Sequence, residues 1–314
     1  MLTHILGGCG TGKSTKLMQQ LRADLETGQK VFVLVPEQFS FEAEKKLYDF
    51  LGAQLFNQLR TYSFATLSRD ILQTYGTAAR TSYASEQEKL LYLYQAVQYC
   101  MAQKELTLLE RRAGAPDFVM ELYDLVTKIR KASVSAETLE TASLVFPDAL
   151  GRKTSDIGRI LLAYDRILQE HGRTDSLVNL TEAAGIADMQ YFFEGIHVYI
   201  DEFDSFTGDQ YRMLEVILKQ AADIAIAVRA DDPHQRPTGM FLGGNNTFFQ
   251  LRRMASDLSL QEEVQYLPEY RRSAHPDLAA VGSGNLRRES GSVPYEGHVH
   301  ILEAADPVME VEYI

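Results

Sequence analysis

The sequence predicts an α/β protein with a parallel sheet, interrupted by an all-helical insertion. An apolar run over residues 2–6 leads through a glycine-rich loop into a helix-like segment, and the β-branched run VFVLV follows at 31–35. A strand–loop–helix–strand unit of this kind is typical of parallel sheets. The insertion is indicated by residues 80–190, where apolar positions repeat with helical spacing and strand-like runs are missing.

The helices of the N-terminal part are predicted from periodicity and from glycine stop signals. The first runs from Lys13 to about Glu26 and has its stop signal at Gly28. FSFEAEKKLYDFLG predicts a second helix that ends at Gly52, and TYSFATLSRDILQTYG predicts a third that ends at Gly76.

The central part of the chain has only helical patterns. It opens with ASEQEKLLYLYQAVQYCMAQ, in which Ser85 and Glu88 form a capping-box pattern. An apolar stripe at helical spacing continues through the stretches APDFVMELYDLVTKIRKAS, KTSDIGRILLAYDRILQEHG and TDSLVNLTEAAG. We therefore expect an insertion built of helices.

Strand patterns return with HVYI at 197–200 and IAIAV at 224–228. Between them, Thr207 and Gln210 form a second capping-box pattern at the start of QYRMLEVILKQAA. After residue 230 the sequence is rich in loop residues, and the later elements are expected to be a helix near 246–257, a strand HVHIL at 298–302 and the opening of a helix in VMEVEYI.

These elements predict three domains. Residues 1–80 and 190–265 form a discontinuous α/β domain, residues 81–189 form the helical insertion, and residues 266–314 begin a second α/β domain. Because the chain stops inside an amphipathic segment, we expect it to be a truncated piece of a longer protein.

Composition indicates an ordinary globular protein. The 314 residues are 45% hydrophobic and 24% charged, and no apolar run approaches the roughly 20 residues that a membrane helix needs. The two cysteines, Cys9 and Cys100, form neither a disulfide framework nor a metal-type cluster. No signal-type segment opens the chain, so we expect a cytoplasmic location without membrane contact.

The net charge of −12 argues against a protein that coats nucleic acid through phosphate neutralisation. It leaves room for a narrow basic channel in an acidic body, because local potential matters more than the sum. Short basic clusters occur, and solvated helix faces are the plain interpretation of each of them: 128–131, 252–253, 271–272 and 287–288.

Residues 7–14, GGCGTGKS, match the phosphate-loop pattern G-x-x-x-x-G-K-[ST] in full. Glycines let backbone N–H groups turn toward phosphates, and the N-terminus of the following helix adds positive potential. In this pattern Lys13 reaches the β- and γ-phosphates, and the Ser14 hydroxyl binds Mg²⁺. We therefore predict a site for ATP and Mg²⁺ with the nucleotide-binding residues Gly7, Gly10, Thr11, Gly12, Lys13, Ser14 and Thr15.

Two alternatives to this prediction stay open. The loop could be a tight glycine-rich turn without a ligand. Cys9 is interpreted as a tolerated small residue, with a redox role as the alternative.

An acidic pair follows the apolar run VYI and supplies the second half of the predicted site. P-loop enzymes hold Mg²⁺ with a carboxylate at the end of a neighbouring strand. Asp201 is the predicted magnesium ligand, and Glu202 lies where a general base would orient the attacking water. A simple loop or helix-start signal is the alternative. Such sites also need a cation for the transition-state charge, and Arg271 and Arg272 are candidates.

Several segments resemble the motifs of UvrD/Rep-type superfamily-one helicases. DEFDSFTGDQYRMLEVIL resembles their second motif, LRTYSFATLSRDILQTYG the segment that lines their single-strand track, and PEYRRSAHPDLAAVGSGNL the motif whose arginine senses the γ-phosphate. The resemblance implies a RecA-like P-loop NTPase domain and gives the γ-phosphate contact to Arg271. It makes Tyr62 and Phe64 candidates for contact with single-stranded DNA, with core packing as the alternative.

Within that group the chain is most similar to the AddB (RexB) family, whose members pair with AddA in AddAB helicase–nucleases. The resemblance covers nearly the whole chain in motif order and is carried by GGCGTGKST, VFVLVPEQFSFEAEKKL, TYSFATLSRDIL, HVYIDEFDSFTGDQ and ILEAADPVMEVEYI. It implies the ATP-binding, DNA-contacting N-terminal region of a subunit that processes double-strand DNA breaks for recombinational repair. An AddA-like subunit and single- and double-stranded DNA are the implied partners.

The same resemblance implies a nuclease module with an iron–sulfur cluster held by four cysteines. This chain has two cysteines, so the module and its cluster are expected only in a C-terminal part beyond it. Two positions also depart from the helicase motifs: Asp204 stands where those proteins have glutamine, and Gln235 in VRADDPHQ is only a loose counterpart of their next glutamine.

The departures leave three interpretations open. The chain is a nucleotide-binding region with weak turnover, part of an active UvrD-like helicase, or a nucleotide-binding scaffold without turnover.

Overall fold

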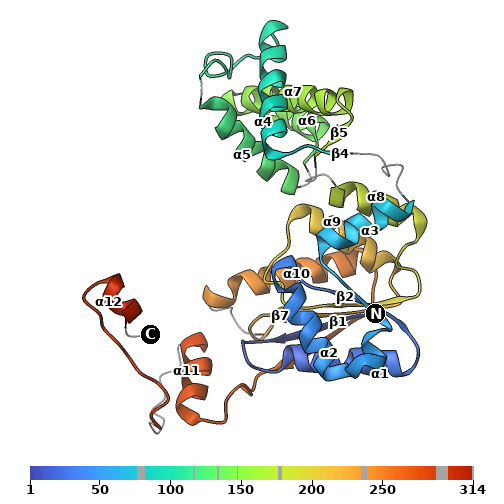
Figure 1. Ribbon diagram of the computed structural model, residues 1–314, viewed down its shortest axis with the longest axis vertical. Helices are drawn as coiled ribbons and strands as arrows, with labels where there is room; N and C mark the ends of the chain where they lie inside the picture. Colours follow the sequence, from blue (N-terminus) through green and yellow to red (C-terminus); the bar gives the residue numbers. More distant parts are fainter. Residues whose placement is uncertain are drawn as a thin grey trace. The chain divides into compact units, whose positions relative to one another are not determined.

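Figure 1 shows a computed structural model of the chain. The structure describes residues 1–75, 82–115, 117–132, 134–146, 148–175, 179–234, 239–287 and 296–312. It divides into two compact units, each described by itself. Unit 1 comprises Met1–Thr61, Ile196–Ser205 and Ala222–Ile314, and unit 2 comprises Tyr62–Gly195 and Phe206–Ala221.

Within the described residues, the centre of unit 1 is a six-stranded sheet. The strands follow one another across the sheet in the order β3 (Leu59–Tyr62), β2 (Lys30–Leu34), β6 (Ile196–Ile200), β7 (Asp223–Arg229), β1 (Leu2–Gly7) and β8 (Glu262–Leu267). The ladders of β1 with β7 and β8, of β2 with β6, and of β6 with β7 are all parallel. The predicted α/β class with a parallel sheet is therefore confirmed.

Helices cover both faces of this sheet (Figure 1). On one face lie α1 (Lys13–Glu26) and α2 (Ser40–Phe56), and on the other lies α10 (Leu242–Asp257). The leucines of α1 pack with the inward side chains of β1, β2 and β7 in one core cluster, whereas Phe248 of α10 meets the His4 ring edge-on from the opposite side. Strands covered on both faces favour apolar residues in nearly every position, which is why β7 carries the continuous run IAIAV and why every residue of β1 is buried, Thr3 and His4 included.

Unit 1 corrects two predictions about where elements lie. The second helix does leave helical geometry at Gly52, with φ of 74°, but a further turn continues it to Phe56. The predicted strand HVHIL is wrong, because residues 298–302 form no strand. No neighbouring strand covers this segment in the described part of the chain, and Ile301 is 97% exposed.

The remaining elements of unit 1 are short or lie at its edges. They are the 3₁₀ helices η1 (Glu37–Phe39) and η3 (Gly239–Phe241) and the helices α11 (Pro276–Arg287) and α12 (Pro307–Glu312). The helix predicted near 246–257 is present as α10, and the helix predicted to open in VMEVEYI is present as α12.

Unit 2 is mainly helical in its described residues. Its helices are α3 (Phe64–Tyr75), α4 (Glu86–Ala102), α5 (Phe118–Lys131), α6 (Ala136–Val145), α7 (Ala149–Glu170), α8 (Asn179–Gln190) and α9 (Gly208–Gln220). Two-residue strands β4 (Ser82–Tyr83) and β5 (Arg173–Thr174) pair in parallel. Gly76, the predicted end of α3, lies outside the described residues.

Both predicted capping boxes are confirmed. The Ser85 N–H donates to Glu88 Oε2 at 2.8 Å, and the Glu88 N–H donates back to Ser85 Oγ at 3.3 Å. At the start of α9, the Thr207 N–H donates to Gln210 Oε1 at 2.9 Å. Each box satisfies N–H groups that the first helical turn leaves without a backbone acceptor.

A buried carboxylate organises the loop after α4. Asp156 on α7 is 0% exposed and accepts the backbone N–H groups of Thr107, Leu108 and Leu109 at distances between 2.8 and 3.1 Å. The Thr107 hydroxyl donates to the same carboxylate at 3.1 Å. These charge-assisted bonds satisfy both carboxylate oxygens and hold the loop against α7.

Asp156→Asn is expected to destabilise unit 2 by about 3 kcal/mol. The amide keeps one acceptor oxygen, but its NH₂ group would face the backbone N–H groups that now donate to the second carboxylate oxygen. Urea unfolding followed by circular dichroism measures the change. Asp117→Asn is the matched control, since Asp117 is exposed and its side chain makes no capping bond. Equal unfolding free energies for the two variants would contradict the role given to Asp156.

Candidate functional site

The glycine-rich loop lies where β1 ends and α1 begins. Gly10 and Gly12 have φ of 77° and 89°, in the left-handed region that glycine adopts without steric cost. Gly12 is the N-cap of α1, so the loop leads directly to the free N–H groups of the first helical turn. These N–H groups and the helix dipole favour an anion at this position.

The Lys13 side chain folds back onto the loop. Its ammonium donates to the Gly8 carbonyl oxygen at 2.7 Å, and the Thr11 hydroxyl donates to the same oxygen at 3.0 Å. Burial lowers the pKa of Lys13, and the nearby Cys9 and Asp201 oppose that shift. The ammonium is therefore partly removed from water and held by a neutral carbonyl, which an anionic group would replace with a gain in electrostatic energy.

Asp201 directly follows β6 at the same edge of the sheet. Its N–H donates to the Leu34 carbonyl oxygen at 3.1 Å, so its backbone still runs beside β2. Its carboxylate accepts the N–H of Glu202 at 2.8 Å. Burial raises the pKa of Asp201, although the nearby Ser14 side chain, the Glu202 N–H and the Lys13 ammonium act in the opposite direction. The structure thus places the two predicted magnesium ligands close to each other.

Glu202 has an unusual backbone and an ionic partner. Its φ is 67°, a left-handed conformation that is uncommon for a residue with a side chain. Lys46 of α2 donates to Glu202 Oε1 at 3.1 Å. Glu202, which is predicted to act as a general base, is therefore paired with the Lys46 ammonium.

The residues after β8 pass over the loop. The Arg271 N–H donates to the Gly10 carbonyl oxygen at 2.7 Å, while the Arg271 guanidinium pairs with Glu269 at 3.1 Å and is 64% exposed. A Cβ placed on Gly10 would lie 2.7 Å from the Tyr270 ring and 2.9 Å from Cβ of Arg272. Glycine is thus required at this position by close approach as well as by φ.

Arg229, at the end of β7, is a cation of this site that the sequence analysis did not select. Its guanidinium pairs with Asp204 at 2.9 Å, and its Nη1 lies 3.8 Å from Sγ of Cys9. Asp204 is the residue that stands where the resembling helicases have glutamine. The sequence did contain a signal for Arg229, because it directly follows the buried run IAIAV. The carboxyl ends of parallel strands share one edge, so this position could have been predicted to lie at the site.

The two aromatic candidates for DNA contact lie in unit 2 and are buried. The Tyr62 hydroxyl donates to Asp70 Oδ2 at 2.5 Å, and Phe64 packs edge-on against Phe206 with ring centroids 6.1 Å apart. These contacts agree with the alternative that Tyr62 and Phe64 pack in the protein interior. DNA contact by either residue stays a prediction. Gln235 lies outside the described residues.

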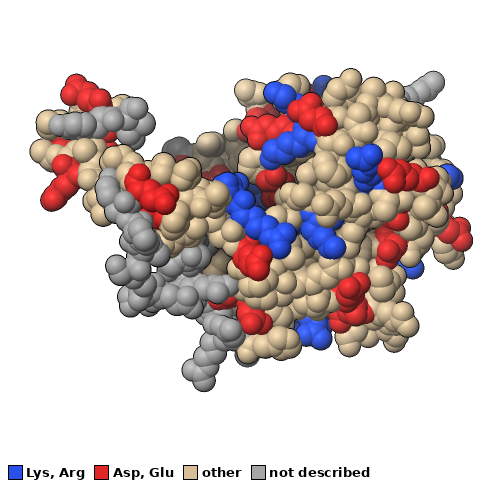
Figure 2. Space-filling model, turned by 90° about the horizontal axis from the view of Figure 1, so that it is seen from below, with Lys and Arg blue, Asp and Glu red and all other residues tan. Residues whose placement is uncertain are grey.

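Charges on the face drawn in Figure 2 are mixed. Lysine and arginine side chains alternate with aspartate and glutamate, and the residues drawn in colour form no continuous basic surface on that face. Among the helices that the structure describes, none combines the length and the apolar character that crossing a membrane requires.

The fold and this site together define an α/β domain that carries a glycine-rich strand-to-helix loop and an acidic strand end on one edge of a parallel sheet. The family model described as "ADDB, N-terminal" matches residues 4–281. The chain therefore belongs to the AddB N-terminal family.

Curated relatives are named as the B subunit of an ATP-dependent helicase/deoxyribonuclease. The protein of Clostridioides difficile (strain 630) is 27% identical over 277 residues, which are 85% of this chain and 23% of the relative. The proteins of Clostridium acetobutylicum and Staphylococcus aureus (strain Newman) are 26% and 24% identical over 100% and 98% of this chain, which correspond to 28% and 27% of their own lengths. The chain thus spans about a quarter of the relatives that it matches.

Proposed function

We propose that this chain is the ATP-binding and DNA-contacting N-terminal region of an AddB-like subunit. The complete protein would act in an ATP-dependent helicase/exonuclease that processes double-strand DNA breaks for recombinational repair. The observation that carries the proposal is that the glycine-rich loop after β1 and Asp201 after β6 lie at one edge of the parallel sheet, where Ser14 and Lys13 are close enough to lower the pKa of the Asp201 carboxyl group against the effect of burial. This edge brings together two segments almost 200 residues apart in sequence, as a magnesium–nucleotide site would require.

The proposed fold is a RecA-like P-loop domain interrupted by a helical insertion, with a second RecA-like domain beginning near residue 266. The parallel sheet with helices on both faces supports the first part of this proposal. The helical content of unit 2 supports the second. In open parallel sheets, ligands bind at the carboxyl edge, which is where the glycine-rich loop and Asp201 lie.

The donor atoms at this edge fit a magnesium ion. Mg²⁺ prefers oxygen ligands and commonly takes one or two from protein together with phosphate oxygens and water. Ser14 and Asp201 supply a hydroxyl and a carboxylate that lie close to each other. When bound, the ion would neutralise charge on the β- and γ-phosphates.

The chain's own residues then have separate tasks. Lys13 would exchange the Gly8 carbonyl for a phosphate oxygen, and the backbone N–H groups of the loop would hold the remaining phosphate oxygens. Glu202 would orient water once it separates from Lys46. Arg271, whose backbone is bonded to Gly10, would turn its exposed guanidinium toward the γ-phosphate.

Partners are proposed from the names of the relatives. Those names describe one subunit of a complex, which supports a second, AddA-like subunit, and "helicase/deoxyribonuclease" supports single- and double-stranded DNA as substrates. The nuclease module and its iron–sulfur cluster would lie in the roughly three quarters of the relatives' length that this chain does not match.

Lys13→Ala is expected to weaken binding of Mg–ATP by about 3 kcal/mol, about a hundredfold in Kd, because it removes a charge-assisted bond to phosphate. Isothermal titration calorimetry measures the affinity. Lys30→Ala is the matched control, since Lys30 is exposed and begins β2 at the amino end of the sheet. The proposal fails if Lys13→Ala and Lys30→Ala bind Mg–ATP equally well.

A second candidate function is a nucleotide-binding scaffold without turnover. The ion pair between Lys46 and Glu202 favours it, because the Lys46 ammonium occupies Oε1, one of the two carboxylate oxygens that would orient water. Asp204, which pairs with Arg229, adds to the case. The active UvrD-like helicase is the opposite alternative.

Glu202→Gln in the full-length protein, assembled with its partner subunit, distinguishes these functions. The scaffold interpretation predicts that DNA-stimulated ATP hydrolysis by the complex stays unchanged, since this site contributes no turnover. The measurement is steady-state phosphate release with and without single-stranded DNA. A fall in that rate would instead assign turnover to this site, provided that Mg–ATP affinity is preserved in the variant.

A further inference from the structure

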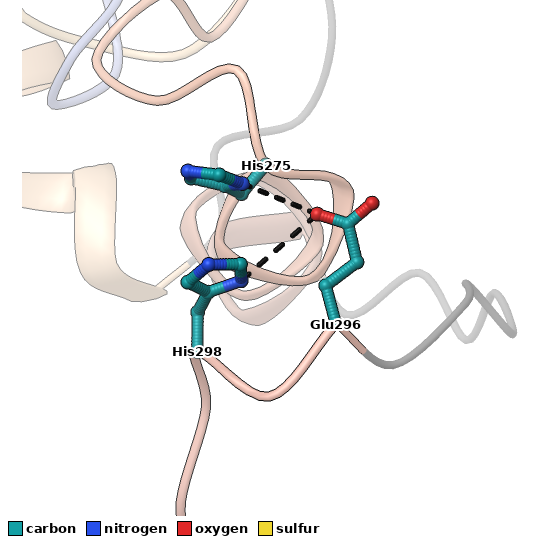
Figure 3. Close-up of side chains that lie close together, drawn as sticks. All are labelled: His275, Glu296 and His298. Atoms are coloured by element: carbon teal, nitrogen blue, oxygen red, sulfur yellow. Dashed lines mark hydrogen bonds and ion pairs between the residues drawn. The ribbon is translucent and has the colours of Figure 1, made fainter.

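A cluster of two histidines and a glutamate lies beside the start of α11 (Figure 3). His275 directly precedes the helix, while Glu296 and His298 come from the segment that returns toward it. Glu296 Oε2 lies 3.2 Å from Nδ1 of His275 and 3.9 Å from Nδ1 of His298. The two imidazole rings stack with their centroids 3.8 Å apart. One carboxylate oxygen thus faces two ring nitrogens.

The buried carboxylate of Asp277 holds this cluster together. It accepts the backbone N–H groups of Leu278, Glu296 and His298 at 2.9, 3.3 and 3.0 Å, and its side chain is only 5% exposed. The first of these bonds belongs to the helix start and the other two to the returning segment. Asp277 therefore fixes the backbone of both parts of the cluster before any ligand is present.

We propose that His275, Glu296 and His298 bind a zinc ion. Two imidazole nitrogens and one carboxylate oxygen form a donor set that Zn²⁺ takes in proteins, with water in the fourth position. Their candidate ligand atoms all lie within 4.8 Å of one another. All three side chains are between 37% and 51% exposed, so an ion from solvent and its water ligand have access.

Binding requires these side chains to rearrange, and the stacked imidazole rings must turn so that both Nδ1 lone pairs point at one ion. Ligands of a tetrahedral zinc ion at about 2.1 Å are about 3.4 Å apart. The separation between Glu296 and His275 already matches, whereas His298 must approach Glu296 and give up its 3.3 Å contact with Asp277 Oδ1. The backbone bonds of Asp277 do not have to break. Zinc would therefore lock the returning segment onto α11 at little cost in backbone order.

The plain alternative is an exposed cluster of ion pairs. Such pairs contribute only about 0–1 kcal/mol each. This cluster differs from the other ion pairs of the described residues, because both of its imidazoles turn Nδ1 toward one carboxylate oxygen. The other histidine–carboxylate pairs, His4 with Glu262 and His197 with Asp24, contain one imidazole each.

Zinc titration of the 314-residue chain tests the proposal, after treatment with a chelator and removal of any purification tag. We expect one zinc ion per chain, measured by competition with a chromophoric chelator, and a cobalt(II) absorption spectrum with nitrogen ligation. His275→Ala and His298→Ala should each weaken binding at least about tenfold, the smallest effect that loss of even an outer partner has on metal affinity. His300→Ala is the matched control, because His300 is exposed and lies on the same segment outside the cluster.

Circular dichroism of each variant establishes that the fold is retained, and the three substitutions change exposed residues. Cys9→Ser should bind zinc like the parent, which separates this cluster from the exposed thiol in the glycine-rich loop. The proposal is overturned if the parent chain takes up no zinc, or if His275→Ala and His298→Ala bind it as tightly as His300→Ala does.

Discussion

Parallel pairing of β1, β7 and β6 is the constraint on which the candidate site depends. In a parallel sheet the carboxyl ends of the strands meet at one edge, so the residues that follow them become neighbours whatever their distance in sequence. This brings the glycine-rich loop after β1, Arg229 at the end of β7 and Asp201 after β6 to the same edge. The nearness of Ser14 and Lys13 to the Asp201 carboxyl group is the direct consequence. A reversal of β6 would place its acidic pair at the far end of the sheet.

The charges of the site are satisfied by one another and by the backbone. Lys13 is held by the Gly8 carbonyl, Glu202 by Lys46, and Arg229 by Asp204. Burial lowers the pKa of Lys13 and raises that of Asp201, and both shifts reflect charges kept partly from water. A magnesium-bound polyphosphate would bring a phosphate oxygen to the Lys13 ammonium and a cation to the Asp201 carboxylate. Glu202 and Arg271 would first have to leave Lys46 and Glu269, which is a physical reason to expect binding to be easier than turnover.

The sequence predicts the interior of unit 1 better than its edges. The runs of β1, β2, β6 and β7 are recognisable because strands covered on both faces are mostly apolar, with Thr3, His4 and His197 as exceptions. The edge strand β8 reads EEVQYL and β3 has only four residues, so neither stood out. HVHIL has strand-like residues but no partner, and a strand forms only where a neighbouring strand pairs with it. At the candidate site, local motifs were enough to predict Lys13, Ser14 and Asp201. The contacts of Lys46 with Glu202 and of Asp277 with residues 296–298 have no local motif, because they arise from long-range folding.

A double-mutant cycle tests most directly whether the loop and the strand end form one magnesium–nucleotide site. The affinity for Mg–ATP would be measured by calorimetry for the parent, Ser14→Ala, Asp201→Asn and the double variant. If both residues hold one ion, the two effects are coupled, and the coupling energy is at least about 1 kcal/mol. Additive effects, within about 0.5 kcal/mol, would show that the two residues act independently and would contradict the account.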